Sequence, residues 1–304
     1  MAAWPHSITI NGYILSETLF GFLCAAALLL CAQACRRPSA QRGFGAGLIF
    51  GAASLTNAIL LPFGILCALF MHWKKIAPRN VCIAIAAAAM LLPCAWAIRN
   101  IQIPVGATTS SANDRALQNL VQGAWPDYHA AWKASLGGDE DGKKKLKSID
   151  EEYQGLRTDL PMGARAIFHR LAEHPLRSAA WYVIEKPFLL WGWDIRIGEG
   201  DVYVFPTNSS PFQTNPLMRT WESLCRGLNL PLGLLAFGSF WLIRSRAGSR
   251  NPAALVMLLL GYVTLLYSVL QAEPRYSIAF RSFEILLGTS AAYWATALSR
   301  NALS

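Results

Sequence analysis

Long apolar runs separated by short polar clusters occupy both ends of this chain. They cover residues 14–34, 44–72, 81–98, 228–243, 254–271 and 283–298. A helix that crosses the hydrocarbon core of a bilayer needs about 20 mainly apolar residues, and the usual range begins at about 17. The pattern therefore predicts an all-α, multi-pass bundle of transmembrane helices.

The second run is too long for one such helix. It extends over residues 44–72, and Pro62 interrupts it. A proline inside a helix removes a hydrogen bond and breaks or kinks the helix. We therefore expect two short helices that meet near residues 57–62, which brings the predicted number of crossings to about seven.

Basic residues cluster directly after the apolar runs and orient them. The clusters are Arg36, Arg37 and Arg42; Lys74, Lys75 and Arg79; Arg244, Arg246 and Arg250; and Arg300. Loops on the cytoplasmic side of a membrane carry an excess of Lys and Arg. This rule predicts a cytoplasmic C-terminus and an external N-terminus, and the expected location is the bacterial inner (plasma) membrane.

Between the two groups of apolar runs lies a long polar segment, which the topology places outside. The predicted organisation is therefore N-terminal membrane helices over 1–98, an external subdomain over 99–227 and C-terminal membrane helices over 228–304. Residues 137–153 are rich in charge and indicate a solvated loop or an exposed helix. Residues 163–177 have the spacing of an amphipathic helix. Residues 181–193 are aromatic and apolar, and we expect them at the membrane interface.

Composition supports a membrane protein over a soluble one. Of the 304 residues, 54% are hydrophobic and 15% are charged, and the mean hydropathy is +0.31. Residues 99–226 carry 15 acidic and 15 basic residues, so the net charge of +9 arises entirely beside the apolar runs. This distribution favours membrane lipids as partners and argues against nucleic acid. The seven cysteines lack a CxxC or Cys/His pattern, so packing is expected of them, with no metal site and no identified cofactor.

Soluble-enzyme motifs such as GxGxxG, GxxxxGK[ST], GxSxG and HExxH do not occur in the sequence. The candidate chemistry lies instead in polar residues near the predicted outer ends of helices: Glu17, Arg99, Glu273, Arg275 and Tyr276. Polar groups at membrane depth are costly and therefore are candidates for function. An arginine fork suits a lipid phosphate because it donates two parallel hydrogen bonds. The alternatives are that Arg99 only reaches the headgroups and that Glu273 pairs only with Arg275.

A glycine pattern recurs in the second run. Gly43, Gly47 and Gly51 follow one another at intervals of four residues and share one helix face. In a membrane, such small residues let two helix backbones approach closely. We expect this face to serve packing.

Five short motifs resemble those of GT-C type membrane glycosyltransferases. The run from Tyr13 to Phe20, which contains Ser16 and Glu17, is similar to a helix start in that group. The run from Gly47 through Gly51 and Leu55 to Thr56 is similar to its "GlxxGlaxLtRP" helix. In this chain Asn57 replaces the usual arginine and the proline is displaced to Pro62.

The other three motifs follow in the same order. Residues 93–100, which end in Arg99 and Asn100, are similar to the "PWxxRN" helix end. Residues 119–126, which begin with Asn119, resemble the external "NLxxGxxP", and residues 273–276 resemble "ExRY". The group includes dolichyl-phosphate-mannose–protein mannosyltransferase-like and aminoarabinose-transferase-like proteins (glycosyltransferase family 39-like).

The resemblance implies transfer of a sugar from a polyprenyl-phosphate carrier to an acceptor on the external face. It implies a substrate site that includes Arg275, Tyr276, Glu273, Glu17, Arg99 and Asn119. The first external loop, which holds the catalytic carboxylate of the family, has no counterpart, so no catalytic residue is assigned.

Three explanations for the missing loop are a fragment of a longer enzyme, an inactive relative that keeps a lipid-phosphate pocket, or a second membrane subunit that supplies the loop. Glu17 or Asp114 could replace the missing base. The competing functions are a non-catalytic membrane scaffold and a transporter-like protein.

Overall fold

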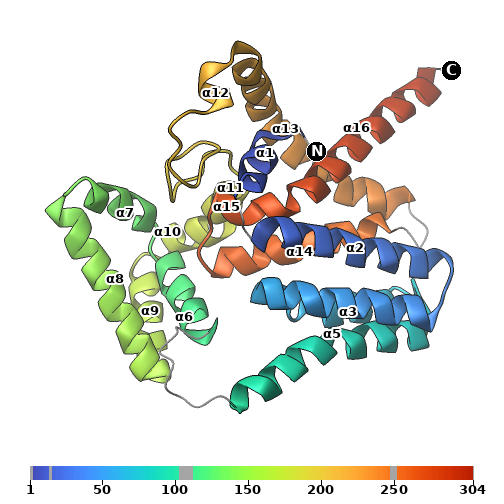
Figure 1. Cartoon of the computed structure of the whole chain (residues 1–304), viewed down its shortest axis with the longest axis horizontal. Coiled ribbons are helices and arrows are strands. Elements are labelled where there is room, and N and C mark those ends of the chain that lie inside the picture. Colours follow the sequence, from blue (N-terminus) through green and yellow to red (C-terminus); the bar gives the residue numbers. More distant parts are fainter. Residues whose placement is uncertain (1–2, 14–15, 103–111, 247–251, 304) are drawn as a thin grey trace. The chain divides into compact units, whose positions relative to one another are not determined.

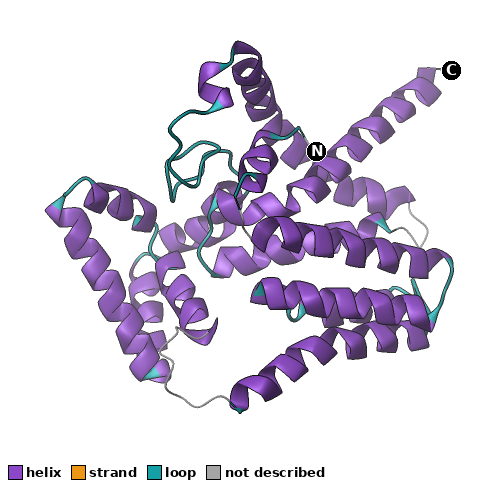
Figure 2. Ribbon diagram, in the orientation of Figure 1, coloured by secondary structure: helices purple, strands orange, loops and turns teal. Residues whose placement is uncertain are grey.

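The structure is a computed structural model and describes residues 3–13, 16–102, 112–246 and 252–303. Helices dominate these residues (Figure 2), and the β structure described among them is one isolated bridge between Gly200 and Tyr203. The predicted all-α fold class is therefore confirmed. Arg250 lies outside the described residues, and the side chains of Arg244, Arg246 and Arg300 are likewise not described.

The chain divides into two compact units. Unit 1 comprises residues 1–107, 210–262 and 278–304, and unit 2 comprises residues 108–209 and 263–277. The chain passes from one unit to the other after residues 107, 209, 262 and 277, whereas the predicted organisation has boundaries after 98 and 227. Residues 210–227 belong to unit 1 because the short helix α12 packs against α13.

Unit 1 is a set of long apolar helices. Its elements are α1 (Pro5–Asn11), α2 (Ser16–Arg36), α3 (Ala40–Thr56), η1 (Ala58–Leu60), α4 (Phe63–Trp73), α5 (Arg79–Ile101), α12 (Pro211–Thr214), α13 (Pro216–Arg246), the first part of α14 (Ala253–Val269), η3 (Ile278–Phe280) and α16 (Arg281–Leu303). Helix α3 packs between α2 and α5 (Figure 1).

The glycine face of α3 lies directly against the backbone of α5. A Cβ on Gly43 would lie 2.8 Å from the carbonyl oxygen of Val81, and one on Gly47 would lie 2.4 Å from that of Ile85. The pairing of Gly51 with Ala89 continues this register. Both partners advance by four residues, so α3 and α5 run parallel. The prediction that this face serves packing is confirmed.

The long second run folds as two helices, as predicted. Asn57 ends α3 and caps η1 by accepting a hydrogen bond from the Ile59 amide at 3.2 Å, and Pro62 precedes α4. Helix α4 follows α3 and precedes α5 in the sequence. Because α3 and α5 are parallel, α4 must run in the opposite direction to both. Its start lies against both of them, since a Cβ on Gly64 would lie 2.7 Å from the Ala89 side chain and 3.3 Å from that of Phe50.

The start of α2 packs against η3. Phe20 is 1% exposed and meets Phe280 edge to face, with ring centroids 5.5 Å apart. Helices α13 and α16 pack on each other, and a buried ion pair within α16 is joined to α13 by one hydrogen bond. Arg281 donates to Glu284 at 2.8 Å and to Asn229 at 3.0 Å.

Unit 2 is a cluster of shorter helices. Its elements are α6 (Ala112–Gly123), α7 (Tyr128–Leu136), α8 (Glu140–Thr158), α9 (Leu160–Glu173), α10 (Pro175–Ala180), the π-helical turn η2 (Trp181–Glu185), α11 (Lys186–Leu190), the end of α14 and α15 (Pro274–Ser277). Its apolar core consists of Val121, Ala124, Tyr128, Ile149, Leu156 and Ile167.

Three predictions concern the surface of unit 2. The charged stretch 137–153 is largely helical, and Asp139 caps α8 by accepting from the Gly142 amide at 2.7 Å. Residues 163–177, predicted as one amphipathic helix, belong to two, because α9 ends at Glu173 and α10 begins at Pro175. In α9, Ile167 and Leu171 pack at the apolar core, whereas Phe168 is 73% exposed. In the segment 181–193 all three tryptophans are buried, and the exposed apolar side chains are Val183, Ile184 and Phe188. The interfacial position of this segment stays a prediction.

Two helices of the described residues, α2 and α5, are long and apolar enough to cross a membrane. Two shorter apolar stretches, Ala58–Trp73 and Ala253–Val269, accompany them. At 1.5 Å per residue a 17-residue helix is about 26 Å long, which is slightly less than the hydrocarbon core of about 30 Å. These helices support a location in a membrane.

Candidate functional site

The candidate site of unit 2 is built around the chain segment 268–276, which contains the end of α14 and the "ExRY" motif. Its first anchor is Lys186. The Lys186 ammonium donates to the carbonyl oxygens of Ser268 at 2.8 Å and Leu270 at 2.7 Å, and it lies 3.4 Å from that of Val269. The last carbonyls of a helix have no partner within the helix. Lys186 therefore caps the C-terminal end of α14.

Burial gives this lysine unusual chemistry. Its side chain is fully buried, and the Tyr182 ring lies 4.1 Å from its Nζ atom. Because burial disfavours the charged form, it lowers the pKa of Lys186 from 10.5 to about 7. The carbonyl dipoles at the helix end and the aromatic face compensate part of this cost, since both attract a cation.

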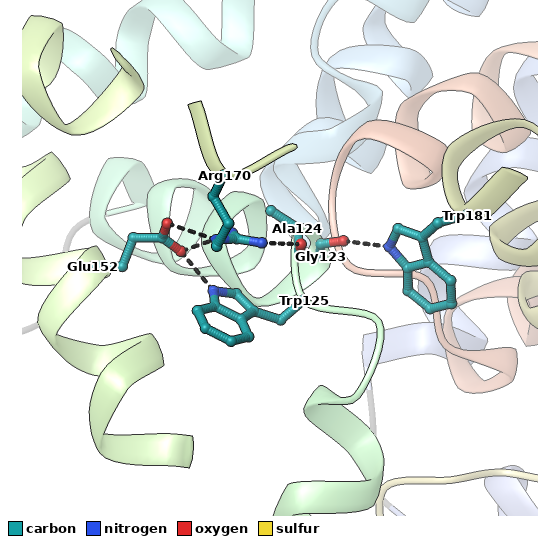
Figure 3. A network of polar contacts seen from close by, with 6 residues as sticks. All are labelled: Gly123, Ala124, Trp125, Glu152, Arg170 and Trp181. Atoms are coloured by element: carbon teal, nitrogen blue, oxygen red, sulfur yellow. Dashed lines mark hydrogen bonds and ion pairs between the residues drawn. The ribbon is translucent and has the colours of Figure 1, made fainter. Parts of the chain in front are cut away.

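The second anchor is Gly123, the glycine of the "NLxxGxxP" motif. A Cβ at this position would lie 2.4 Å from the Leu270 carbonyl oxygen and 2.8 Å from the Gln271 amide nitrogen. A residue without a side chain is therefore required where α6 meets the segment. The Gly123 carbonyl accepts a hydrogen bond from the Trp181 indole at 2.9 Å, and Figure 3 shows this contact.

The third anchor is the carboxylate of Glu273, which is 1% exposed. Its Oε1 accepts from the backbone amides of Arg196 at 2.6 Å and Ile197 at 3.2 Å. Its Oε2 lies 3.0 Å from Nε2 of His129, which is also buried. Glu273 therefore joins three parts of unit 2, and its described partners are these groups in place of the Arg275 that we considered.

Arg275 and Tyr276 follow on the short helix α15. Tyr276 stacks on Tyr267 with ring centroids 5.0 Å apart, and its hydroxyl donates to Gln271 at 3.3 Å. Arg275 is half-buried, and its guanidinium carbon lies 5.9 Å from the centre of the Phe205 ring. The anchored segment thus holds an arginine and a phenol on consecutive residues, and the exposed ring of Phe205 lies near the arginine.

A polar network supports α6 beside this segment (Figure 3). Arg170 forms two hydrogen bonds with the Glu152 carboxylate, at 3.1 and 3.0 Å, and a third with the Ala124 carbonyl at 3.0 Å. Its guanidinium stacks 4.2 Å from the Trp125 ring, whose indole N–H also donates to Glu152 at 2.5 Å. This network fixes the residues that follow Gly123 and so positions His129.

The remaining predicted site residues divide between the units. Asn119 is half-buried on α6 of unit 2. Glu17 and Arg99 belong to unit 1, at the start of α2 and near the end of α5, which lie at the same end of the helix layer in Figure 1. Arg99 is exposed and stacks on Trp96 at 4.7 Å. Asp114, a candidate base, pairs with Arg157 at 3.2 Å.

The motifs of unit 1 also meet one another. Gly51, from the glycine-rich motif, would place a Cβ 3.4 Å from the ring of Pro93, the first residue of the "PWxxRN"-like motif. Within each unit, then, two motifs that are distant in the sequence pack together. In unit 2 these are the "NLxxGxxP"-like and "ExRY"-like segments, which meet through Gly123 and through the pair of His129 and Glu273.

Reasoning from the sequence missed the partners of this segment. The sequence motifs assigned no site role to His129 or Lys186, yet each is buried in unit 2, His129 against Glu273 and Lys186 against the end of α14. For Lys186 the available signal was a lysine inside an aromatic stretch. His129 carried no signal of spacing, because His129 and Glu273 are far apart in the sequence.

We compared the chain with models of protein families, with curated proteins and with solved structures, and none of them matches.

Proposed function

We propose that this chain is an integral membrane protein of the GT-C glycosyltransferase type that binds a polyprenyl-phosphate-linked sugar on the external face of the bacterial inner membrane. In this proposal the long apolar helices of unit 1, together with α14, cross the membrane about seven times. Residues 108–209, which form most of unit 2, lie outside. The two membrane-capable helices and the placement of the basic clusters support this arrangement.

One observation carries the proposal. The "NLxxGxxP"-like and "ExRY"-like segments, which lie far apart in the sequence, pack together in unit 2 and leave Arg275 half-exposed. Glu273 serves as the buried anchor of the motif, and Arg275 follows it as the group that can reach a ligand. Such a division of roles is what a phosphate site requires, because a bound anion needs a donor whose backbone is already held in place.

In the proposed site the Arg275 guanidinium donates two hydrogen bonds to the lipid phosphate. Phe205, which is 39% exposed, and the Tyr276 ring provide apolar surface for the prenyl group or the sugar. Transfer of the sugar also needs a base that takes the acceptor proton. We assign no base to this chain, so the part of the reaction that its residues support is binding of the donor.

The direct test is binding of farnesyl phosphate, as a short polyprenyl phosphate, to the full chain in nonionic detergent. Arg275→Gln should weaken binding by roughly 10- to 100-fold, because a hydrogen bond to a charged group contributes about 1.5–3 kcal/mol. Arg275→Lys should restore only part of the affinity, since lysine keeps the charge but lacks the fork.

Arg196→Gln is the matched control. It removes the same charge from the same unit, but the contact of residue 196 with Glu273 uses the backbone amide, and its side chain is exposed. Equal affinities of the wild type and Arg275→Gln would remove Arg275 from the site. A wild type that does not bind farnesyl phosphate would favour a membrane scaffold, the alternative function, in which the contacts of Glu273 and Lys186 serve packing alone.

A further inference from the structure

A cavity of about 790 Å³ opens in unit 1 at the turn between α4 and α5. Leu69, Trp73 and Ile76 line its apolar part, and His72, Lys75 and Arg79 line its polar part. This cavity lies at the end of the helices where we predict the cytoplasm, so it is separate from the external site proposed above.

The turn between α2 and α3 contributes Pro38 to the same cavity. The basic cluster at Arg36 and Arg37 directly precedes this proline, and the second cluster at Lys74, Lys75 and Arg79 surrounds the other turn. The structure therefore brings two basic clusters, separated by two helices, to one end of unit 1. This is the arrangement that the orientation rule for Lys and Arg predicts.

The positive charge of the cavity is not neutralised by the protein. Residues 18–113 contain no aspartate or glutamate. Among the residues that the structure describes, Lys75 and Arg79 form no ion pair with a carboxylate. The neighbouring Lys74 differs, because its ammonium stacks 4.0 Å from the Trp73 ring. The cavity thus presents two cations that lack a counter-charge.

Lys75 occupies a backbone position that normally favours glycine. Its φ is 53°, and it follows α4 at the point where the Ile76 amide donates back to the Met71 carbonyl at 2.9 Å. This closing turn usually has glycine in the left-handed position, since other residues are strained there. A lysine at this position costs stability, and in return it places an ammonium group at the cavity.

The apolar part of the cavity continues onto the exposed surface of α4. Leu69 is 61% exposed and Trp73 is 71% exposed. Helix α5, one of the two membrane-capable helices, begins at Arg79 beside them. The end of a membrane-crossing helix is the level of the lipid headgroups, and the acyl chains extend from there along the helices.

From this arrangement we propose that the cavity binds the phosphate headgroup of an anionic phospholipid. Lys75 and Arg79 contact the phosphate, and the lipid's acyl chains lie along Leu69 and Trp73. Basic pockets at the cytoplasmic ends of membrane helices suit such headgroups, because charge and apolar surface are both complementary to one lipid molecule.

The test uses the full chain in nonionic detergent and measures lipid retention by native mass spectrometry. The probes are dihexanoyl phosphatidylglycerol, dihexanoyl phosphatidylcholine and inorganic phosphate. We expect phosphatidylglycerol to bind more tightly than the other two probes. The double variant K75G/R79Q should reduce its affinity by about 30-fold, which corresponds to the loss of two basic contacts at a lipid surface.

Lys75→Gly alone keeps the proposal testable if the double variant does not fold. Glycine suits the backbone at this position, so the melting temperature should stay equal or rise while phosphatidylglycerol binding falls about fivefold. The matched control K143Q/K147Q removes two exposed lysines of α8 in unit 2 and should leave binding unchanged.

Three results would overturn the inference. The first is equal binding of phosphatidylcholine and phosphatidylglycerol. The second is unchanged phosphatidylglycerol binding in a folded Lys75→Gly variant. The third is inorganic phosphate binding as tightly as phosphatidylglycerol, which would make the free anion the ligand and leave the apolar surface without a role.

Discussion

Two regions of the molecule are tightly packed: the interface between α3 and α5 in unit 1, and the anchored segment 268–276 in unit 2. Different interactions stabilise each of them. In unit 1, Gly47 brings two helix backbones together without side chains between them. In unit 2, the charged side chains of Lys186 and Glu273 are buried and hold the chain through hydrogen bonds. This difference in packing agrees with the proposal that lipid surrounds unit 1 and water surrounds most of unit 2.

Helices in lipid gain little from burying apolar side chains, because lipid tails are as apolar as the side chains. Close backbone approach, which increases van der Waals contact, then becomes the main source of cohesion. A unit in water has an apolar core to stabilise it and can bury charges if each has a partner. The two units are therefore expected to respond differently to substitution.

The largest effect should come from Glu273→Ala. It leaves the buried His129 and the amides of Arg196 and Ile197 without an acceptor, which should cost about 3–5 kcal/mol of unfolding free energy. Glu273→Gln should cost less, because its amide oxygen still accepts from both backbone groups. Hydrogen exchange should rise at residues 196–197 and around His129. An unchanged stability would show that the carboxylate is not an anchor.

The next effect is a dependence of stability on pH. Between pH 7 and 10.5 the unfolded chain keeps a proton on Lys186 that the folded chain has lost, since burial lowers its pKa to about 7. Stability should therefore rise with pH in this window, by about 3 kcal/mol from pH 7.5 to 10. Urea titrations over this range measure the slope. Lys186→Met removes the titrating group and should flatten it, and an equal slope in both proteins would contradict this role.

A smaller effect is expected from Gly47→Ala, which tests unit 1. The new methyl group would lie 2.4 Å from the Ile85 carbonyl oxygen and push α3 away from α5, at a cost of about 1–3 kcal/mol. Gly45→Ala is the control, because its Cβ would meet Leu30 at an ordinary 3.5 Å. Hydrogen exchange should rise in α3 and α5 only for the first variant. If both variants behave alike, close backbone approach is not what holds these helices.

Much of the fold followed from local patterns. Apolar runs predicted the helices, Pro62 predicted the break before α4, and the spacing of Gly43, Gly47 and Gly51 predicted a packing face. Each of these signals lies within a few turns of the structure that it predicts. The boundaries of unit 2 could not be predicted in this way. Residues 263–277 belong to this unit, but more than fifty residues of unit 1 separate them from residue 209 in the sequence.

The site was harder to predict for the same physical reason. The motifs identified Arg275 and Glu273 as a pair of polar residues, but nothing nearby in the sequence distinguishes a buried anchor from a half-exposed arginine. The contacts that decide this come from His129 and from the backbone of residues 196–197. Such long-range partners leave no periodic trace, so geometry was needed to assign the two roles.

The discontinuity of unit 2 sets an order of events during synthesis. When the ribosome has finished residue 209, His129 and Lys186 are already made, but Glu273 and the end of α14 are not. At 5–20 residues per second, about 3–13 seconds pass before residue 273 is added. During that interval His129 has not met Glu273, and Lys186 has not met the carbonyls of α14. Unit 2 can complete its folding only after α14 and the residues that follow it have been synthesised.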